Sequence, residues 1–592
     1  MRDPAAPHAG PGAGGAILFG ALLLPFGYAA GFGFPFGDDF ARAVLARGLF
    51  DWVGGLHDMV WNWQHWSGRY THHFMAVFLG DAVLGRAGYA AVCLAVLALY
   101  GAAAFGIVSE VAGAARLRDR IGLALAALAT LCAGHGALDV THYVVTDALA
   151  LGLGNALVLA HVWALCRLWH RPAAGRGATA LAAGTAVLAV GCYEHAAIAT
   201  VVASVLAAWM AHRSGHPRRR AFLAVAGAAM ASGLLSFLAP GNFGRQRIRD
   251  VTRDRIAAQL LGAGEDWLVV AAGGFASHFA LFAALLGLWL APAAHPGFAP
   301  VPRSRMAVAG MLAFVAVSAG IVLVHALSDV RVTDTRKLPA SAQLLLGIVL
   351  AYVAVASAGP LRARAAALPA WTRSVLPALA LFAVLAASDN TRRVLASIAS
   401  GALQAHARTM ERRLEVLAAE KRADLEVAPL SACPYPACVG DPVPAIASAW
   451  PAAHIARLYG ERSVRVAAPD PGRAYADASS SSVPPAWTRL ADSGLSAAAA
   501  FVQPGPNATY RDAWLFLRVP ENDAAPRAAV AFRQPDALAD TVRRLQLVRL
   551  ERGAAAPRLF GAPLGIADDA GIPSVELAVD GAAPVRVPLR AR

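Results

Sequence analysis

The hydrophobic residues of this chain gather in long runs over its first two thirds, and short polar segments separate the runs. A helix needs about 20 mostly apolar residues to cross a bilayer. The runs that approach this length lie at residues 15–35, 88–110, 121–138, 147–168, 177–193, 196–212, 221–238, 267–291, 306–326, 341–358 and 374–389. The pattern predicts a polytopic α-helical membrane protein with about 11 transmembrane helices. A shorter run at 71–85 carries His72, His73 and Asp81, and we expect it to be re-entrant or interfacial.

Arginines mark every second loop between these runs. They are Arg116, Arg118 and Arg120; Arg167, Arg171 and Arg176; Arg213, Arg218, Arg219 and Arg220; Arg303 and Arg305; and Arg362, Arg364 and Arg373. Loops rich in Lys and Arg stay in the cytoplasm, so we expect a cytoplasmic N-terminus and an extracytoplasmic C-terminus. The first run is interpreted as an uncleaved span rather than a signal peptide, because Arg2 is its only basic flank and no clear cleavage site precedes Asp38.

The pattern changes near residue 390. Residues 392–424 read as an amphipathic helix that leaves the membrane. Beyond it, short runs alternate apolar and polar residues, which is typical of strands. These runs are Ser463–Val466, Trp514–Val519, Ala529–Phe532, Leu545–Leu550 and Val575–Val579. We therefore expect a GT-C-like transmembrane domain at 1–390 (named for the resemblance described below), a connecting helix at 391–428 and an extracytoplasmic β-rich, sandwich-like domain at 429–592, with a Ser-rich linker at Asp477–Pro485.

Composition agrees with a membrane protein and excludes an ordinary soluble enzyme. Of 592 residues, 57% are hydrophobic and 15% charged, against about 25% charged in soluble domains. The net charge of +14 would suit a nucleic-acid binder, but its arginines sit in short clusters between apolar runs, so we expect no nucleic acid. Cys433 and Cys438 lie in a polar segment outside the predicted membrane core and favour a local disulfide over a zinc site.

The predicted outward loops carry the unusual polar residues. Asp38 and Asp39 follow the first run, and two adjacent carboxylates near a membrane can serve as a general base or bind a cation. The alternative is an ordinary helix end that faces water. Within the same loop, Trp66-Ser67-Gly68-Arg69-Tyr70 places a guanidinium between two aromatic rings, an arrangement suited to a phosphate or a sugar. An interfacial aromatic belt is the competing explanation.

Three further outward loops extend the candidate site. Tyr193-Glu194-His195 stands between two runs with almost no linker, so Glu194 and His195 are expected to face a cavity. The fourth loop begins Ala239-Pro240-Gly241-Asn242 and continues to Arg245, and the fifth contains Arg331, Arg336 and Lys337. These cations break the orientation rule and favour an anionic ligand, here a lipid phosphate. The alternative is that they pair locally with neighbouring acids such as Asp250 or Asp334.

In these residues the sequence resembles the GT-C superfamily of polytopic glycosyltransferases, and in particular a bacterial membrane family of unknown function within it. The likeness rests on Asp38-Asp39, Trp66-Ser67-Gly68-Arg69, Tyr193-Glu194, and Ala239-Pro240-Gly241-Asn242 with Arg245, in this order over residues 35–340. The resemblance implies transfer of a sugar from a polyprenyl-phosphate donor to a glycan or lipid acceptor at the outer face of the bacterial cytoplasmic membrane. Some members use a divalent metal, and metal dependence stays open here.

The resemblance also implies roles for single residues. Asp39 or Asp38 would be the base toward the acceptor, with Asp39 preferred, and Glu194 is a third catalytic candidate. The expected substrate-binding residues are Trp66, Arg69, Tyr70, His195, Asn242, Arg245, Arg331, Arg336 and Lys337. Three other functions remain possible at this point: a transporter or flippase of lipid-linked sugars, a non-catalytic envelope polysaccharide assembly protein, and an O-antigen-type polymerase.

Overall fold

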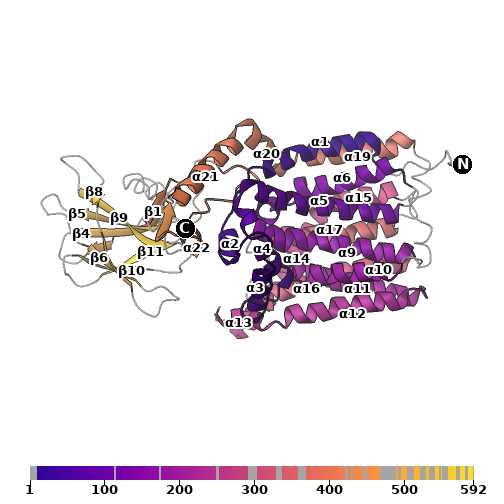
Figure 1. The fold of residues 1–592 in the computed structure, drawn as a ribbon, viewed down its shortest axis with the longest axis horizontal. Helices are drawn as coiled ribbons and strands as arrows, with labels where there is room; N and C mark the ends of the chain where they lie inside the picture. The colour runs from indigo at the N-terminus through magenta and orange to yellow at the C-terminus, as the bar shows by residue number, and fades with distance from the viewer. Residues whose placement is uncertain are drawn as a thin grey trace. The chain divides into compact units, whose positions relative to one another are not determined.

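A computed structural model describes most of the chain. The described residues are 10–112, 115–171, 175–248, 253–290, 303–327, 336–357, 369–419, 424–428, 430, 433–443 and 450–466, together with the strands between 488 and 590. The chain divides into two compact units. The first comprises Met1–Pro35, Leu45–Leu403 and Pro434–Val439, and the second comprises Phe36–Val44, Gln404–Cys433 and Gly440–Arg592. Figure 1 labels their helices and strands.

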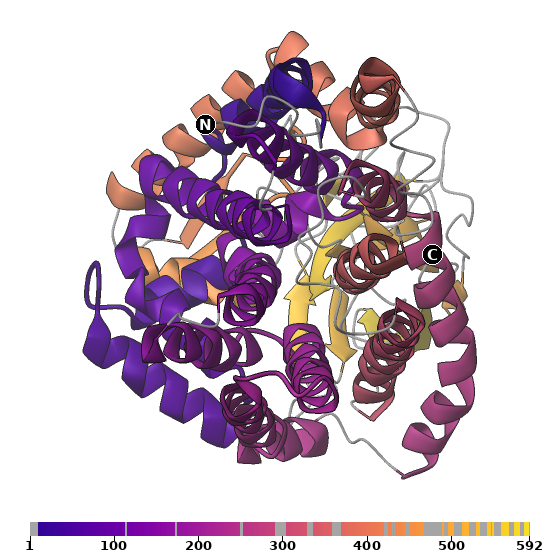
Figure 2. The ribbon, with the colours of Figure 1, turned by 90° about the vertical axis from the view of Figure 1, so that its right-hand side faces the viewer.

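The first unit is a bundle of long helices that are seen nearly end-on in Figure 2. The long helices are α1 (Gly12–Ala30), α5 (Arg86–Val111), α6 (Leu117–Gly134), α9 (Leu153–His170), α10 (Arg176–Val190), α11 (Glu194–Arg213), α12 (Arg219–Phe237), α14 (Arg253–Ala276), α15 (His278–Leu290), α16 (Arg303–Leu327), α17 (Lys337–Ser357) and α19 (Ala370–Ala386). Buried side chains such as Phe19, Leu123, Trp289 and Leu381 join α1, α6, α15 and α19 in one of its cores. Apolar residues also cover much of the outside, as expected of helices surrounded by lipid.

Within the described residues, seven helices are long and apolar enough to cross a membrane, and nine if two bent pairs are each one span. The bent pairs are α14 with α15, at 48°, and α19 with α20 (Asp389–Ala399), at 60°. A helix is present at each of the apolar runs predicted from the sequence, but α6 and α10 are not among the seven. The chain is thus a multi-pass helical membrane protein by length and composition, and the count of about 11 spans stays a prediction.

Short helices gather at the end of the bundle where α11 and α17 begin and where α12 and α16 end (Figure 1). They are α3 (Trp52–His65), α4 (Tyr70–Phe78), η1 (Gly80–Leu84), α7 (Leu138–Tyr143), α8 (Val145–Asp147) and α13 (Pro240–Ile248), with a π-helical turn η2 (Ala148–Gly152) leading into α9. The run at 71–85 therefore forms α4 and η1. The opposite ends of α9, α11 and α12 carry Arg167, Arg213 and Arg219.

The helix predicted at 392–424 is divided. Gly401, at a φ of 70°, separates α20 from α21 (Ala402–Ala419), because a left-handed residue cannot continue a helix. Residues 420–423, with Lys421 and Arg422, lie outside the described residues. Cys433 and Cys438 are disulfide-bonded, whereas Cys93, Cys132, Cys166 and Cys192 are thiols.

The disulfide closes a short loop whose tip, Tyr435, packs in the first unit. Tyr435 is buried, its backbone N donates to Ser397 Oγ at 3.1 Å, and the guanidinium of Arg393 lies 4.1 Å from the centre of its ring. Burial raises the pKa of the Tyr435 phenol. This short loop is therefore tied to α20 by a hydrogen bond and a cation–π contact.

The second unit contains α2 (Asp38–Leu45, up to Val44), most of α21, α22 (Trp450–Tyr459) and the described strands. β1 (Asp424–Val427) and β2 (Ser463–Val466) pair in parallel. The other strands are β3 (Thr488–Leu490), β4 (Leu495–Val502), β5 (Asp512–Val519), β6 (Ala528–Phe532), β7 (Thr541–Leu545), β8 (Val548–Arg549), β9 (Arg558–Ala567), β10 (Ser574–Val579) and β11 (Val585–Arg590).

These nine strands form one sheet in the order β7-β6-β10-β11-β4-β5-β9-β8, with β3 beside β4. Each alternating run noted in the sequence overlaps one or two of the strands. The sandwich and its side of the membrane stay predictions, and the linker Asp477–Pro485 lies outside the described residues. A buried ion pair between Arg413 of α21 and Asp441 is part of this unit.

Candidate functional site

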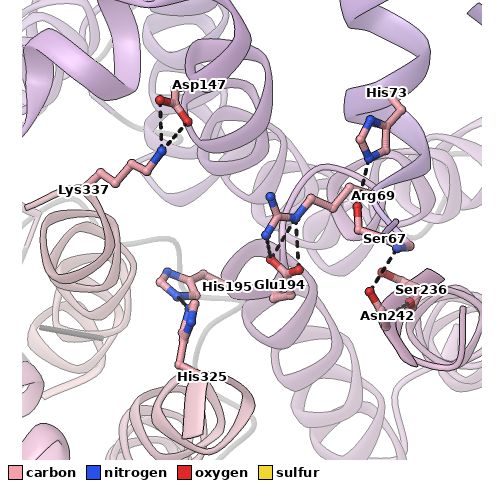
Figure 3. Close-up of polar contacts among 11 residues, drawn as sticks. Ser67, Arg69, His73, Asp147, Glu194, His195, Ser236, Asn242, His325 and Lys337 are labelled. Atoms are coloured by element: carbon pink, nitrogen blue, oxygen red, sulfur yellow. Dashed lines mark hydrogen bonds and ion pairs between the residues drawn. The ribbon is translucent and has the colours of Figure 1, made fainter. Parts of the chain in front are cut away.

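The residues that the sequence singled out in the first, third and fifth predicted outward loops meet at one end of the helical bundle. Arg69 precedes α4, Glu194 and His195 begin α11, and Lys337 begins α17. Figure 3 shows these side chains converging from separate helices, with Arg69 and Glu194 in the middle. The site belongs entirely to the first unit, so one compact body positions it.

Arg69 and Glu194 form a two-pronged ion pair. Nε of Arg69 donates to Oε1 and Oε2 of Glu194 at 3.0 and 3.1 Å, and Nη2 lies 2.9 Å from Oε2. The guanidinium also stacks over the ring of Tyr193, 4.2 Å from its centre. Burial opposes the charge on Arg69, yet the Glu194 carboxylate, with smaller effects of Tyr193 and Asp147, outweighs it and raises the pKa of the guanidinium. Arg69 is therefore a permanent cation, and its planar guanidinium group is held in one orientation.

Backbone contacts fix the segment that carries Arg69. The backbone N of both Trp66 and Ser67 donates to the carbonyl of Asn62 at 2.8 Å. Gly68 N donates to Oδ1 of Asn242 at 3.3 Å, and the amide of Asn242 donates in turn to the carbonyls of Ser236 and Phe237. A side chain at Gly68 would overlap the carbonyl of Ser236. Asn242, expected to bind substrate, therefore has its amide engaged in joining the Arg69 segment to the end of α12.

The Tyr70 hydroxyl and ring are engaged by residues other than Arg69. The Tyr70 hydroxyl donates to the carbonyl of Val187 at 2.6 Å, and the backbone of Gly191 packs against the Tyr70 ring. Burial raises the pKa of Tyr70 to about 12, so it stays neutral at physiological pH. Tyr193 is the ring that stacks on Arg69 instead.

The cations of the fifth loop pair with acids of the second. Lys337 Nζ donates to Oδ1 and Oδ2 of Asp147 at 2.9 and 3.1 Å, and Arg336 Nη2 donates to Oδ2 of Asp139 at 3.1 Å. Asp139 is buried while Arg336 is largely exposed. The Arg69–Glu194 and Lys337–Asp147 pairs lie at the same end of the bundle (Figure 3), and we call the four residues together the Arg69 network. Among the described residues, Arg69, Arg336 and Lys337 each have a carboxylate partner, and these partners lie far away in sequence rather than being the neighbouring acids of the local-pairing alternative.

Two buried histidines lie beside this network. Nε2 of His195 and Nε2 of His325, at the end of α16, are 2.8 Å apart, and the Tyr193 ring contacts both imidazoles. One nitrogen must donate and the other accept, so the pair shares one proton in this arrangement. On the other side of Arg69, Ser67 Oγ and His73 Nε2 are 2.9 Å apart, and Asp58 approaches Nδ1 of His73 at 3.9 Å.

Among the described residues no group of three or more His, Cys, Asp or Glu could hold a metal ion. Arg331 lies outside the described residues, and the side chain of Arg245, on α13, does too. Neither can be assigned a place in the site.

Asp38 and Asp39 belong to the second unit, and the structure describes them apart from the Arg69 network. Both lie in the first turn of α2. Asp39 is buried, with Oδ2 accepting from the backbone N of Phe36 at 2.9 Å, whereas Asp38 is exposed. Adjacent residues on a helix point in different directions, so the two carboxylates have separate surroundings rather than one shared site.

His325 and Asp147 are the site residues that sequence reasoning left out of the candidate set. His325 is a lone histidine near the end of an otherwise apolar run, a pattern that marks function in membrane helices. Asp147 begins the fourth run, and only its partner Lys337 reveals its place in the network. No family model, curated protein or solved structure matches this chain.

Proposed function

We propose that this protein is a membrane glycosyltransferase that moves a sugar from a polyprenyl-phosphate donor to a glycan or lipid acceptor at the outer face of the bacterial cytoplasmic membrane. The observation that carries the proposal is the network of Arg69, Glu194, Asp147 and Lys337 at one end of an apolar helical bundle. A planar guanidinium and an ammonium near the bilayer surface are the groups that bind a lipid phosphate.

The paired carboxylates do not argue against anion binding. A bound phosphate can replace Asp147 on Lys337, since both side chains of this pair are partly exposed. Glu194 holds the Arg69 fork in place, so a phosphate would meet an oriented donor set rather than a mobile side chain. In this proposal Glu194 positions Arg69, and Arg336 extends the positive edge.

The reaction would be a direct displacement at the anomeric carbon. The acceptor oxygen forms a bond to that carbon, the bond from the carbon to the phosphate oxygen breaks, and the acceptor proton passes to a carboxylate. The resemblance implies Asp39, or Asp38, for this role; both residues belong to the second unit, which is described by itself. Arg69 and Lys337 would stabilise the charge that develops on the departing polyprenyl phosphate.

Mass spectrometry of envelope glycans and lipid-linked sugars in a deletion strain tests the proposal. We expect a missing sugar and an accumulated lipid-linked donor, restored by the wild-type gene. Complementation with Asp38→Asn, Asp39→Asn and Arg69→Gln, at equal membrane levels, then separates the roles, with the exposed Arg392→Gln as a control. Unchanged glycan and lipid profiles in the deletion strain would contradict the proposal, as would full activity of both Asp variants.

A transporter of lipid-linked sugars is the second candidate, because two helix pairs are bent. The breaks fall at Ser277 and between Ala386 and Asp389. Broken helices at membrane depth are typical of transporters. Proteoliposomes containing a fluorescent polyprenyl-phosphate sugar distinguish the two: a transporter moves the probe between leaflets without an acceptor, whereas a transferase consumes it only when an acceptor is present.

A further inference from the structure

The helix α3 divides its surface into three sectors. With a turn of about 100° per residue, the exposed side chains of Trp52, Val53, Leu56 and Val60 lie within about 100° of one another. The adjoining sector is exposed too, but it holds His57, Trp61, Gln64 and His65. The remaining sector is buried and holds Gly55, Asp58 and Asn62. One helix thus presents an apolar face, a mainly polar face and a packed face.

The apolar face is large and continues beyond the helix. Trp52 is 62% exposed and Val53 67% exposed, and Leu49 and Phe50 just before α3 are also exposed. Phe50 has a φ of 60°, a conformation that non-glycine residues adopt at a cost. The Trp52 ring packs against Phe78 of α4 with the ring centres 4.9 Å apart, which makes the patch a firm aromatic surface.

This face joins the outer surface of a membrane-crossing helix. On α12, Leu223, Met230 and Leu234 are exposed along one side, and the exposed Leu238 follows the helix on the same side. Trp63 of α3 donates from its indole Nε1 to the carbonyl of Leu235 at 3.0 Å. The exposed apolar stripe on α12 therefore ends where α3 is attached, and α3 lies at that end of the bundle (Figure 1).

From these contacts we infer that α3 is an interfacial helix, with its apolar face in the acyl-chain boundary of one leaflet and its polar face toward the headgroups and water. A helix with a separate apolar and polar face and Trp at the apolar side binds a membrane surface in this way. The lipid leaflet is the occupant that the continuity with α12 indicates. Asn62, on the packed face, holds the start of the Arg69 segment through Trp66 and Ser67. The helix thereby sets Arg69 at the depth of lipid headgroups.

Spin labels on α3 in proteoliposomes test this inference. Single cysteines would replace Val53, Leu56 or Val60, with Gln64→Cys and His57→Cys as matched controls on the polar face, all in a Cys166→Ser background. The three apolar positions should collide several-fold more with oxygen, which concentrates in the bilayer, than with a water-soluble nickel chelate. The two controls should show the reverse preference.

Two results would overturn the inference. Water-like collision ratios at Val53, Leu56 and Val60 would mean that the face lies outside the bilayer. Low collision with both reagents, together with an immobilised spectrum, would mean that protein covers the face. The five substitutions on α3 are at exposed positions, so folding should be retained, and labelling of the Cys166→Ser parent measures the background.

Discussion

Asn242 accepts a hydrogen bond from the backbone of Gly68 across 174 residues of sequence, and this contact joins the Arg69 segment to the end of α12. Gly68 is essential to it, since any Cβ there would overlap the Ser236 carbonyl, which itself accepts from Asn242. The site therefore depends on a close approach of two backbones that only glycine permits.

We expect Gly68→Ala to destabilise the protein by about 3 kcal/mol, because the backbone of Ser236 cannot move as a flexible side chain can. The measurement is the thermal midpoint in detergent. Gly184→Ala is the matched control: Gly184 lies in α10 with open space around it, and alanine there should stabilise by up to about 1 kcal/mol. Equal midpoints for Gly68→Ala and wild type would contradict the described approach.

The Arg69–Glu194 pair should show strong coupling. Arg69→Gln and Glu194→Gln each leave a mostly buried charge without its partner, so each should cost about 3 kcal/mol. The double variant should cost clearly less than the sum of the two. A double-mutant cycle of unfolding free energies measures this, and simple additivity would show that the pair is not formed in the protein.

Substitutions of Lys337 and of Asp147 should change the affinity for an anion in opposite directions. Asp147→Asn removes the carboxylate that competes for the Lys337 ammonium, so binding of a polyprenyl phosphate should tighten several-fold. Lys337→Gln should weaken it. Affinities measured by native mass spectrometry or fluorescence titration give the comparison. If both variants shift the affinity in the same direction, Lys337 does not contact the phosphate.

His142 should make the protein sensitive to acid. Burial, with His135 close by, holds the pKa of His142 well below its usual value near 6.5. As the pH falls below about 6.5, the unfolded chain takes up a proton that the folded state refuses, so stability falls by up to about 1.4 kcal/mol per pH unit until the lowered pKa is reached. His142→Phe should lose less than wild type between pH 7 and pH 5. Parallel loss of the thermal midpoint in both proteins would refute this.

In the loop closed by Cys433 and Cys438, the aromatic ring of Tyr435 should contribute more to stability than the Tyr435 hydroxyl does. Tyr435→Ala removes the ring beneath Arg393 and should cost about 3–5 kcal/mol. Tyr435→Phe should be neutral or mildly stabilising, because the buried hydroxyl has no hydrogen-bond partner among the described residues. Thermal midpoints of the two variants test this, and a large loss in Tyr435→Phe would mean that the hydroxyl is engaged.

The hydrophobic pattern was a good guide to where helices lie, because apolar length is a local property of the chain. The hydrophobic pattern did not show where the helices are broken. The break at Ser277 falls within one continuous apolar run, where the only local signs are Gly273 and Gly274 one turn earlier and the Ser277 hydroxyl, which donates to the carbonyl of Gly274 at 2.7 Å. The break before α20 carried a local signal: Ser388 Oγ caps the new helix by accepting from Thr391 N.

Some of the residues that lie together in the structure were named from the sequence, but their pairing was not. Unusual polar residues in the predicted outward loops led to Arg69, Glu194, His195 and Lys337. Nothing local shows that Arg69 meets Glu194 across 125 residues, since the distance is closed by tertiary packing. For the same reason His325 escaped notice until His195 was found against it.

The Arg69 network contains two cations, Arg69 and Lys337, each matched to a carboxylate, and Arg336 beside it is matched to Asp139. Its summed charge is zero, so its field falls off much faster with distance than that of a single charge. Such a site gives an approaching anion little long-range guidance. Capture would depend on lateral diffusion within the leaflet and on contact, and its rate should respond only weakly to ionic strength.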